Sequence, residues 1–523
     1  MQKLPIGIQN FEDIRKENYL YVDKTKQILN LIENGKCYFL SRPRRFGKSL
    51  TISTLEAMFK GKAELFKGLY AEDWVKEQTK SPNPVIKLDM TGLGNYKTIE
   101  ELNNALIYIV KNSIKQYKLN ISYDENINNN AGLVFFQIIN ELYEKLGKVV
   151  ILIDEYDKPI TDNINDLEKA NEIREFLRSF YGILKNSTIS DNLHFVFITG
   201  VSKFSKAGVF SSLNNLEDIS LDKNYSDIVG YTQKELEENF SDWLDKTEKE
   251  LSIDREDLIA KIEEYYDGFS FDGIVRVYNP FSVLNFFKQG NFSNYWYYSA
   301  TPSFLANYLK KHEIKEPKEY IQKRVTSNFT DSHEIENASV ESFLYQAGYL
   351  TIKERKGNIL ILDYPNEEVK SSMDSLYLEN FYNIKDFAGF SNDIWESLEA
   401  ENIPQIVSIF NEALKGVPYE DYKDRDESWY RSLFLMLLSG AKITYFSEVH
   451  TFKGRSDVVI TFKDKLVVVI EFKFAQTSKD VDKKRQEGEK QIKSRDYAST
   501  YKATKKIITA VFVTDDEKRQ VTL

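Results

Sequence analysis

The chain has 523 residues, which is too many for a single hydrophobic core and predicts about three domains. Hydrophobic residues make up 42% and charged residues 29%, as is ordinary for a soluble globular protein. The formal net charge of -10 excludes a uniformly basic surface, so any contact with nucleic acid is expected from a local patch.

The residues that commonly form disulfides or bind zinc are few. Cys37 is the only cysteine, which excludes an intrachain disulfide and a cysteine-based metal cluster. The four histidines are scattered without the spacing of zinc ligands. The N-terminus lacks an apolar signal core, and no apolar run approaches the length of a membrane span. We therefore expect a cytoplasmic protein with no membrane partner.

A basic loop follows the short apolar run 37–40. It reads Arg42-Pro43-Arg44-Arg45-Phe46-Gly47-Lys48-Ser49 and precedes a segment with helical character. A strand, a tight loop ending in Gly-Lys-Ser and a helix form a phosphate-binding device. Loop N–H groups and the helix N-terminus face the anion, Lys48 supplies a charge, and the Ser49 hydroxyl can ligate Mg²⁺. The pattern predicts a nucleotide-driven protein.

This loop departs from the usual pattern at two positions. Arg42 stands where a first glycine belongs, and Pro43 contributes no backbone donor. Arg44 and Arg45 can compensate by contacting phosphate oxygens directly. The alternative for both is a solvated basic turn, and the sequence leaves the two interpretations open.

A second predicted strand, 149–153, is apolar throughout and ends in Asp154-Glu155. Such a run is typical of a strand buried on both faces, and the two acids are typical of a Walker B motif. Asp154 is expected to hold Mg²⁺ with Ser49, and Glu155 to orient or deprotonate the attacking water. A third strand, 194–198, leads into Thr199, which either senses the terminal phosphate or belongs to an ordinary turn.

Between these two strands the segment 171–185 is a predicted helix, with Arg174 and Arg178 four residues apart on one face. An arginine in this position can reach the nucleotide of a neighbouring subunit, which leaves a homo-oligomer open. The alternative is a solvated helix face.

The pattern of elements changes twice along the chain. Residues 1–215 alternate strand-like runs with amphipathic segments, which predicts a P-loop domain with a parallel sheet covered by helices. Residues 216–370 read as aromatic-rich helices followed by a helix and a hairpin, which predicts a helical lid and a winged-helix-like linker. Residues 371–523 are the third predicted domain, with a core at about 425–515. The predicted fold class is therefore α/β multidomain.

The third predicted domain contains a second charged motif. Asp457 opens one apolar strand, and the strand 466–474 contains Glu471-Phe472-Lys473. The spacing suits a hairpin that brings Glu471 and Lys473 onto one face beside Asp457. Adjacent carboxylates repel each other, and a divalent cation relieves that repulsion. Mg²⁺ held there can activate a water, with Lys473 positioning the water or stabilising the transition state.

A surface ladder of salt bridges is the alternative for this second motif. Glu427, on a predicted helix, and Glu448, at the start of the preceding strand, are each candidates for a further ligand. Gln491 lies on a short basic helix, 490–493, that can face the strand to be cut.

Two sets of motifs carry a resemblance to known families. The segments 4–7, 21–25 and 153–159, together with the basic loop, resemble the bacterial AAA-ATPase-like family. Asp457, Glu471-Phe472-Lys473 and Gln491-Ile492-Lys493 resemble the PD-(D/E)XK nuclease superfamily, whose restriction-endonuclease-like α/β domain is commonly fused behind the first. Ser456 replaces the proline of that motif, at a position where the superfamily is permissive.

Residues and resemblance together predict a protein that binds and hydrolyses ATP and thereby controls a Mg²⁺-dependent nuclease acting on DNA. The resemblance implies an NTPase of signal transduction or of genome defence. The alternative is a regulatory NTPase whose nuclease-like domain only binds nucleic acid or a protein partner. The predicted catalytic residues are Glu155, Asp457, Glu471 and Lys473. The predicted nucleotide ligands are Arg44, Arg45, Gly47, Lys48, Ser49, Asp154 and Thr199, and the predicted metal ligands are Ser49, Asp154, Asp457 and Glu471.

Overall fold

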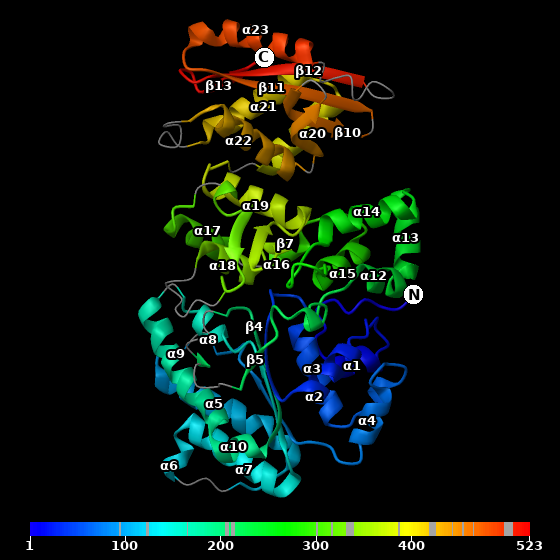
Figure 1. Ribbon diagram of the computed structural model, residues 1–523, viewed down its shortest axis with the longest axis vertical. Coiled ribbons are helices and arrows are strands. Elements are labelled where there is room, and N and C mark those ends of the chain that lie inside the picture. The colour runs from blue at the N-terminus through cyan, green and yellow to red at the C-terminus, as the bar shows by residue number, and fades with distance from the viewer. Residues whose placement is uncertain are drawn as a thin grey trace. The chain divides into compact units, whose positions relative to one another are not determined.

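The computed structural model describes residues 1–93, 96–121, 125–164, 166–203, 209–210, 215–299, 302–314, 317–330, 339–384, 387–417, 425–441, 443–451, 454–463, 465–495 and 506–523. The chain divides into two compact units. Figure 1 shows the helices and strands of both. The first consists of Met1–Ala300 with Pro317–Glu367, and the second of Thr301–Glu316 with Glu368–Leu523. The first unit thus contains the predicted P-loop region and most of the region predicted as lid and linker.

A five-stranded sheet in the order β2-β3-β4-β1-β5 lies at the centre of the P-loop region. Its strands are β1 (Cys37–Ser41), β2 (Val85–Asp89), β3 (Val149–Asp154), β4 (Leu193–Gly200) and β5 (Glu217–Asp218). All neighbouring strands are parallel. Every residue of β3 is buried, as expected for an apolar strand covered on both faces. The predicted parallel sheet is confirmed.

Helices connect these strands, and polar side chains define where several of them begin. The helices are α1 (Phe11–Lys16), α2 (Thr25–Asn34), α3 (Lys48–Phe59), α4 (Glu72–Gln78), α5 (Ile99–Ser113), α6 (Glu125–Asn128), α7 (Ala131–Leu146), α8 (Lys158–Thr161), α9 (Leu167–Gly182) and α10 (Ser187–Asn192). The side chains of Asn10, Thr98, Asn130 and Asp166 accept first-turn N–H groups of α1, α5, α7 and α9. Such caps satisfy donors that have no partner inside the helix.

The rest of the first unit is helical and then forms a small sheet. Its helices are α12 (Gln233–Asn239), α13 (Ser241–Leu251), α14 (Arg255–Tyr266), α15 (Pro280–Gln289), α16 (Tyr295–Ser299) and α18 (Val340–Ala347). α12 to α15 share an apolar core that also contains Leu20 and Val22 from the N-terminal segment. The N-terminal segment and helices α12 to α15, which lie in the region predicted as a lid, therefore bury apolar surface against each other.

The predicted helix and hairpin are confirmed as α18 followed by β7 (Thr351–Lys356) and β8 (Ile359–Asp363). A third strand, β6 (Lys323–Thr326), pairs with β8 and was not predicted. Its sequence, Lys-Arg-Val-Thr, has one apolar residue, and three of its four residues are exposed. It therefore lacks the alternation of apolar and polar residues that predicts a strand.

The second unit contains a mixed five-stranded sheet in the order β13-β12-β11-β10-β9. Its strands are β9 (Tyr445–Thr451), β10 (Gly454–Phe462), β11 (Leu466–Ala475), β12 (Lys506–Asp515) and β13 (Gln520–Thr522). Only β11 and β12 are parallel, and α23 (Val481–Arg495) lies between them in the chain, as a parallel crossover requires. The other helices are α17 (Pro302–Lys311), α19 (Glu367–Asn380), α20 (Phe387–Glu399), α21 (Ile403–Lys415) and α22 (Glu427–Gly440).

Among the residues that the structure describes, every helix falls short of the length and apolar character that crossing a membrane requires.

Phe434 of α22 is fully buried in the second unit, where its ring lies 5.8 Å from that of Phe472 and 5.4 Å from that of Phe512. We predict that Phe434→Ala lowers the free energy of unfolding of this unit by about 3–5 kcal/mol, because it removes an aromatic side chain and leaves a cavity. Hydrogen–deuterium exchange of β11 and β12 peptides, followed through a urea series, measures the loss.

Phe446→Ala is the matched control, because Phe446 lies on β9 of the same unit and its side chain is 51% exposed. The control is expected to cause a much smaller loss. Equal losses in the two variants would contradict the packing described for α22.

Candidate nucleotide site and candidate nuclease site

Parallel pairing brings the carboxyl ends of β1, β3 and β4 to one edge of the first sheet. Ser41 at the end of β1 pairs with Gly200 at the end of β4, and Ile153 of β3 pairs with Ile198. Asp154 therefore lies beside Thr199. Ligands of open parallel sheets bind at this edge, where loops and helix N-termini converge.

The loop from β1 to α3 turns sharply enough to present the N-terminus of α3. Arg45 has a φ of 68° and Gly47 a φ of 99°, both in the left-handed region, which glycine adopts without strain. Gly47 is the N-cap of α3, and no side chain caps this helix. Its first N–H groups and the positive end of its dipole therefore point to the site, as anion binding requires. Lys48 and Ser49 are the first two residues of α3.

The Lys48 ammonium is folded into the loop. It donates hydrogen bonds of 2.9 Å to the carbonyl oxygens of Arg42 and Pro43, and the side chain is buried. Burial lowers the pKa of Lys48, whereas the nearby carboxylates of Asp154 and Glu155 raise it. The structure thus brings the predicted lysine and both predicted acids together.

The two acids have different surroundings. Asp154 is buried, and its Oδ1 accepts a 2.7 Å hydrogen bond from the Thr199 hydroxyl and a 3.1 Å bond from the Glu155 N–H. Glu155 has a φ of 51°, and its Oε2 accepts a 3.3 Å bond from the Thr91 hydroxyl. Burial raises the pKa of Glu155, and Lys48 opposes that effect. The Thr199 hydroxyl is therefore aimed at Asp154 and fixes the orientation of that carboxylate.

Sequence reasoning missed Asp157, which organises the turn after β4. Asp157 is buried and accepts hydrogen bonds from the N–H groups of Val201 and Ser202, and a 2.6 Å bond from the Ser202 hydroxyl. Ser202, three residues after Thr199, thus contacts Asp157. The only signal in the sequence was that Asp157 is acidic and follows Asp154 by three positions.

The arginines of the loop lie in different surroundings. Arg42 is buried and donates to the carbonyl oxygens of Ser220 and Tyr225 at 2.7 and 3.2 Å, with its guanidinium 3.9 Å from the centroid of Phe271. Arg44 is half-buried, and its positive charge lowers the pKa of Glu155. Arg45 is exposed and lies 5.1 Å from the Phe281 ring centroid.

Residues far along the chain support the back of the loop. The Trp296 indole N–H donates a 3.1 Å hydrogen bond to the Arg44 carbonyl oxygen, and the Trp296 side chain is buried. Gly348 is so close to the loop that a Cβ there would lie 2.7 Å from the Cβ of Pro43. Trp296 is therefore part of the core.

A cavity of about 70 Å³ lies beside Gly47 and was not predicted. It is lined mainly by apolar groups from the N-terminal segment, the start of α3 and the segment 228–231. The residues that line it include Leu20, Val22, Lys24, Phe46, Gly47, Leu50, Thr51, Ile228, Val229, Gly230 and Tyr231. The cavity adjoins the uncapped end of α3, because Gly47, the N-cap of that helix, is among its lining residues.

The predicted arginine pair of α9 has local partners. Both Arg174 and Arg178 form ion pairs with Glu175, at 3.6 and 3.3 Å.

In the second unit, a hairpin places the predicted nuclease residues together. β10 and β11 are antiparallel, and their pairing ends at Val458 and Ile470, so Asp457 and Glu471 are the next residues on the two strands. The Phe472 N–H donates a 2.8 Å hydrogen bond to Asp457 Oδ2. The register expected from the spacing in the sequence is thus the one observed.

Cations accompany both of these carboxylates. Glu471 is 1% exposed, and its Oε1 accepts a 2.8 Å hydrogen bond from Lys473, two residues further along the same face of β11. Asp457 Oδ1 accepts a 2.9 Å bond from Arg431 of α22. Arg431 was missed by sequence reasoning, although it lies four residues after Glu427, on the same face of one helix.

Glu427 also faces this cluster. Burial raises the pKa of Glu427, while the charge of Lys473 lowers it and that of Asp457 raises it. The structure thus brings Glu427 close to the predicted nuclease residues. The side chain of Glu448 lies outside the described residues.

Asp457 and Glu471 fit a hard divalent cation, because their carboxylates lie side by side on neighbouring strands and oxygen atoms are the ligands that such a cation prefers. Among the described residues, no group of three or more His, Cys, Asp or Glu side chains is arranged to hold a metal. Mg²⁺ commonly binds through only one or two protein carboxylates, together with waters and substrate phosphates. Asp457 and Glu471 are therefore sufficient as protein ligands.

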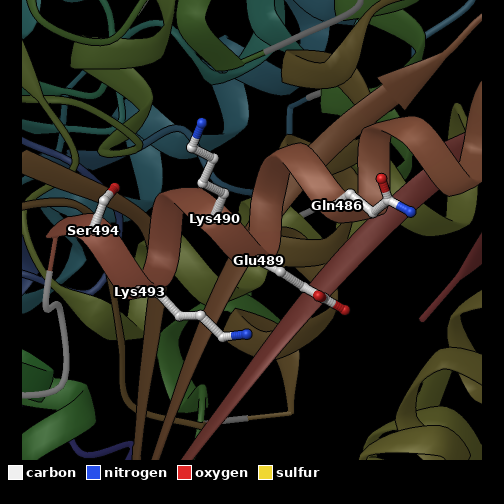
Figure 2. A pocket seen from close by; sticks show the side chains of 5 residues that line it. All are labelled: Gln486, Glu489, Lys490, Lys493 and Ser494. Carbon is white, nitrogen blue, oxygen red and sulfur yellow. The ribbon is translucent and has the colours of Figure 1, made fainter.

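α23 presents charged side chains around an open hollow. Figure 2 shows Gln486, Glu489, Lys490, Lys493 and Ser494 lining it, with Lys490 and Lys493 extending in different directions. Gly488 of the same helix packs so closely on β12 that a Cβ there would lie 2.5 Å from Val511. This contact holds α23 against the sheet that carries the nuclease motif.

Two family models match separate parts of the chain. One, described as a predicted AAA-ATPase, matches residues 5–210, which contain the phosphate loop and the acids of β3. The other, described as the PD-(D/E)XK nuclease superfamily, matches residues 425–522, which contain Asp457, Glu471 and Lys473.

Whole-chain similarity is found with a protein of Azotobacter chroococcum mcd 1, described as an uncharacterized protein in the vnfD 5' region. The two are 34% identical over 516 residues, which cover 96% of this chain and 94% of that protein.

Two structures from Aeropyrum pernix show distant similarity. The ORC2 protein in its ADPNP–ADP complexes has a TM-score of 0.27 at 8% identity, covering 69% of this chain and 97% of that one. The ORC1 protein in complex with DNA has a TM-score of 0.25 at 9% identity, covering 83% and 88%. At these TM-scores neither similarity supports a conclusion about this chain. The family matches and the relative of nearly equal length do support one. The chain belongs to the same family as the Azotobacter protein, with an N-terminal domain of the predicted AAA-ATPase family and a C-terminal domain of the PD-(D/E)XK nuclease superfamily.

Proposed function

We propose that the first unit binds and hydrolyses ATP, and that its nucleotide state controls a Mg²⁺-dependent nuclease in the second unit that cuts DNA in genome defence. One observation carries the proposal: the buried Lys48 ammonium lies at the uncapped N-terminus of α3 and close to Asp154 and Glu155. Opposite charges at a helix N-terminus suit a nucleotide whose anionic phosphates arrive together with a metal ion.

In this proposal each residue of the nucleotide site has a separate task. Gly47 and the following N–H groups bind phosphate oxygens, while Lys48 and Arg44 supply positive charge. Arg45 joins them by leaving Phe281. Ser49 and Asp154 would hold the metal, which supplies charge to the phosphates, and Thr199 keeps Asp154 in position. Glu155 orients the attacking water, because it directly follows Asp154 and its pKa is raised by burial.

In the nuclease site, Asp457 and Glu471 would hold the divalent cation. Bound there, the cation would supply Lewis acidity and a nucleophilic water at neutral pH. Lys473 holds Glu471 in place through a 2.8 Å hydrogen bond and would position that water. Lys490 and Lys493 of α23 would contact DNA phosphates outside the site, with the salt dependence that such contacts confer.

A second candidate function has its own support. Asp457 is engaged through both oxygens, by Arg431 and by the Phe472 N–H, and Glu471 by Lys473. Such pairing would stabilise a nuclease-like domain that binds nucleic acid or a protein partner without cutting. Incubation of the protein with plasmid DNA and with an RNA, in the presence of Mg²⁺ and then of a chelator, separates the two candidates.

Lys48→Ala tests the nucleotide site. We expect it to weaken ATP binding by about tenfold to 100-fold, because a charge-assisted hydrogen bond contributes about 1.5–3 kcal/mol. Isothermal titration calorimetry measures the affinity. Lys80→Ala is the control, because Lys80 is exposed and pairs only with Glu77 among the contacts described. An unchanged affinity in Lys48→Ala would remove the phosphate-loop assignment.

Asp457→Asn tests the nuclease site. Metal-dependent DNA cleavage should fall to background, because an amide is a poor ligand for a hard cation, while ATP turnover persists in the other unit. Asp482→Asn is the control, because Asp482 lies in the same unit with a side chain that is 84% exposed. Cleavage that survives in highly purified Asp457→Asn protein would place the activity elsewhere.

Control of one activity by the other is tested with two variants that fix the nucleotide state. Glu155→Gln should bind ATP without hydrolysing it, and Lys48→Ala should stay mostly nucleotide-free at ATP concentrations near the wild-type Kd. We expect their cleavage rates to differ by more than about tenfold, because a shift of a few kcal/mol between two conformations suffices for that. Rates are measured with no nucleotide, ADP, ATP and a non-hydrolysable analogue. Identical rates in every condition would leave two independent activities.

A further inference from the structure

The segment 21–25, Tyr-Val-Asp-Lys-Thr, takes no part in the chemistry proposed above. Its lysine is nevertheless buried, with 8% of its surface exposed. The Lys24 ammonium lies 2.6 Å from each carboxylate oxygen of Glu235, and it donates a 2.8 Å hydrogen bond to the Asp227 carbonyl oxygen. One side chain thus joins the N-terminal segment to a part of the chain more than 200 residues later.

The residues on either side of Lys24 fix its backbone by hydrogen bonds to the loop before α4. Asp23 Oδ2 accepts a 2.8 Å hydrogen bond from the Tyr70 N–H, and the Thr25 hydroxyl accepts a 3.1 Å bond from the Ala71 N–H. The backbone that carries Lys24 is therefore tied to the loop before α4, which limits its freedom to follow Glu235.

The partner is equally well fixed. Glu235 accepts hydrogen bonds from both the N–H and the hydroxyl of Thr232, and the Thr232 hydroxyl accepts the Glu235 N–H in return. These bonds form the capping box that begins α12. Lys24 therefore holds the N-terminus of a lid helix.

The cavity beside Gly47 lies at this junction. Lys24 is among the residues that line it, and so are Ile228, Val229, Gly230 and Tyr231 of the segment that Lys24 holds through Asp227 and Glu235. An apolar cavity next to a phosphate-binding helix end suits the planar base of a nucleotide.

We propose that Lys24 and Glu235 form a clasp that holds residues 227–235 over this cavity and so sets how long a bound nucleotide is retained through its base. This inference rests on the proposed nucleotide binding of the first unit. Lys24 is a positioning residue, because its ammonium is already taken up by Glu235 and the Asp227 carbonyl. The clasp acts on the base and leaves the phosphate contacts of Lys48 unchanged.

The test compares ATP with inorganic tripolyphosphate, which has the phosphates but no base. Lys24→Met and Glu235→Gln remove the charge pair, and glutamine can still complete the capping box of α12. Both variants should bind ATP about tenfold more weakly. They should also release a fluorescent ATP analogue about tenfold faster, because loss of a buried charge pair mainly raises the dissociation rate. Tripolyphosphate affinity should stay at the wild-type value. The double variant should be no weaker than either single one.

Lys26→Met is the matched control, because Lys26 lies two residues away and is exposed. Wild-type ATP affinity and release in Lys24→Met would overturn the clasp, and so would equal losses for ATP and tripolyphosphate, which indicate a general loss of structure. Strictly additive losses in the double variant would overturn the pairing. A wild-type protein that binds neither ligand would instead overturn the proposed nucleotide binding itself.

Discussion

Lys48 is a charged side chain held in the interior of the protein, and the first site is organised around it. A buried ammonium without partners would lose its proton or unfold its surroundings. Here the carbonyl oxygens of Arg42 and Pro43 accept its hydrogen bonds, and the nearby acids of β3 oppose the lowering of its pKa by burial. That arrangement needs the left-handed turns at Arg45 and Gly47, and it needs β3 to end where β1 ends. The order of the strands, the conformation of the loop and the position of the acids thus together place polar partners around the buried Lys48 ammonium.

The second unit solves the same problem with the signs reversed. Asp457 and Glu471 are buried acids, and a cation from a helix and a cation from the same strand offset them. In both units the strands that converge are apolar, so the medium around the charges is poor at screening them. Each site therefore combines strong local fields with a fixed geometry, which is the condition for binding phosphates and metals selectively.

Local sequence patterns predicted the strands and their register. They did not predict which residues distant in the sequence contact each other. The apolar run 149–153 predicted β3, and the spacing of Asp457 and Glu471 predicted their register, because strand periodicity is local. Arg42 looked like a defective glycine position, since its carbonyl partner at Ser220 lies 178 residues away. The carboxylate partners of Arg431 and Lys24, which are Asp457 and Glu235, are also distant in the sequence and could not be predicted from local patterns. Only the folded chain reveals which distant backbone or carboxylate a buried cation meets.

The aromatic backing of the phosphate loop has a consequence for where this protein can be divided. The family match ends at residue 210, yet Phe271, Trp296 and Gly348 support the loop from beyond that point. A fragment cut at residue 210 would keep every nucleotide motif while losing the three partners that shape the loop. Arg42 and the Phe46 ring, packed 4.9 Å from Phe269, would then face water. A fragment that keeps the supported loop therefore has to extend past residue 210 to Gly348.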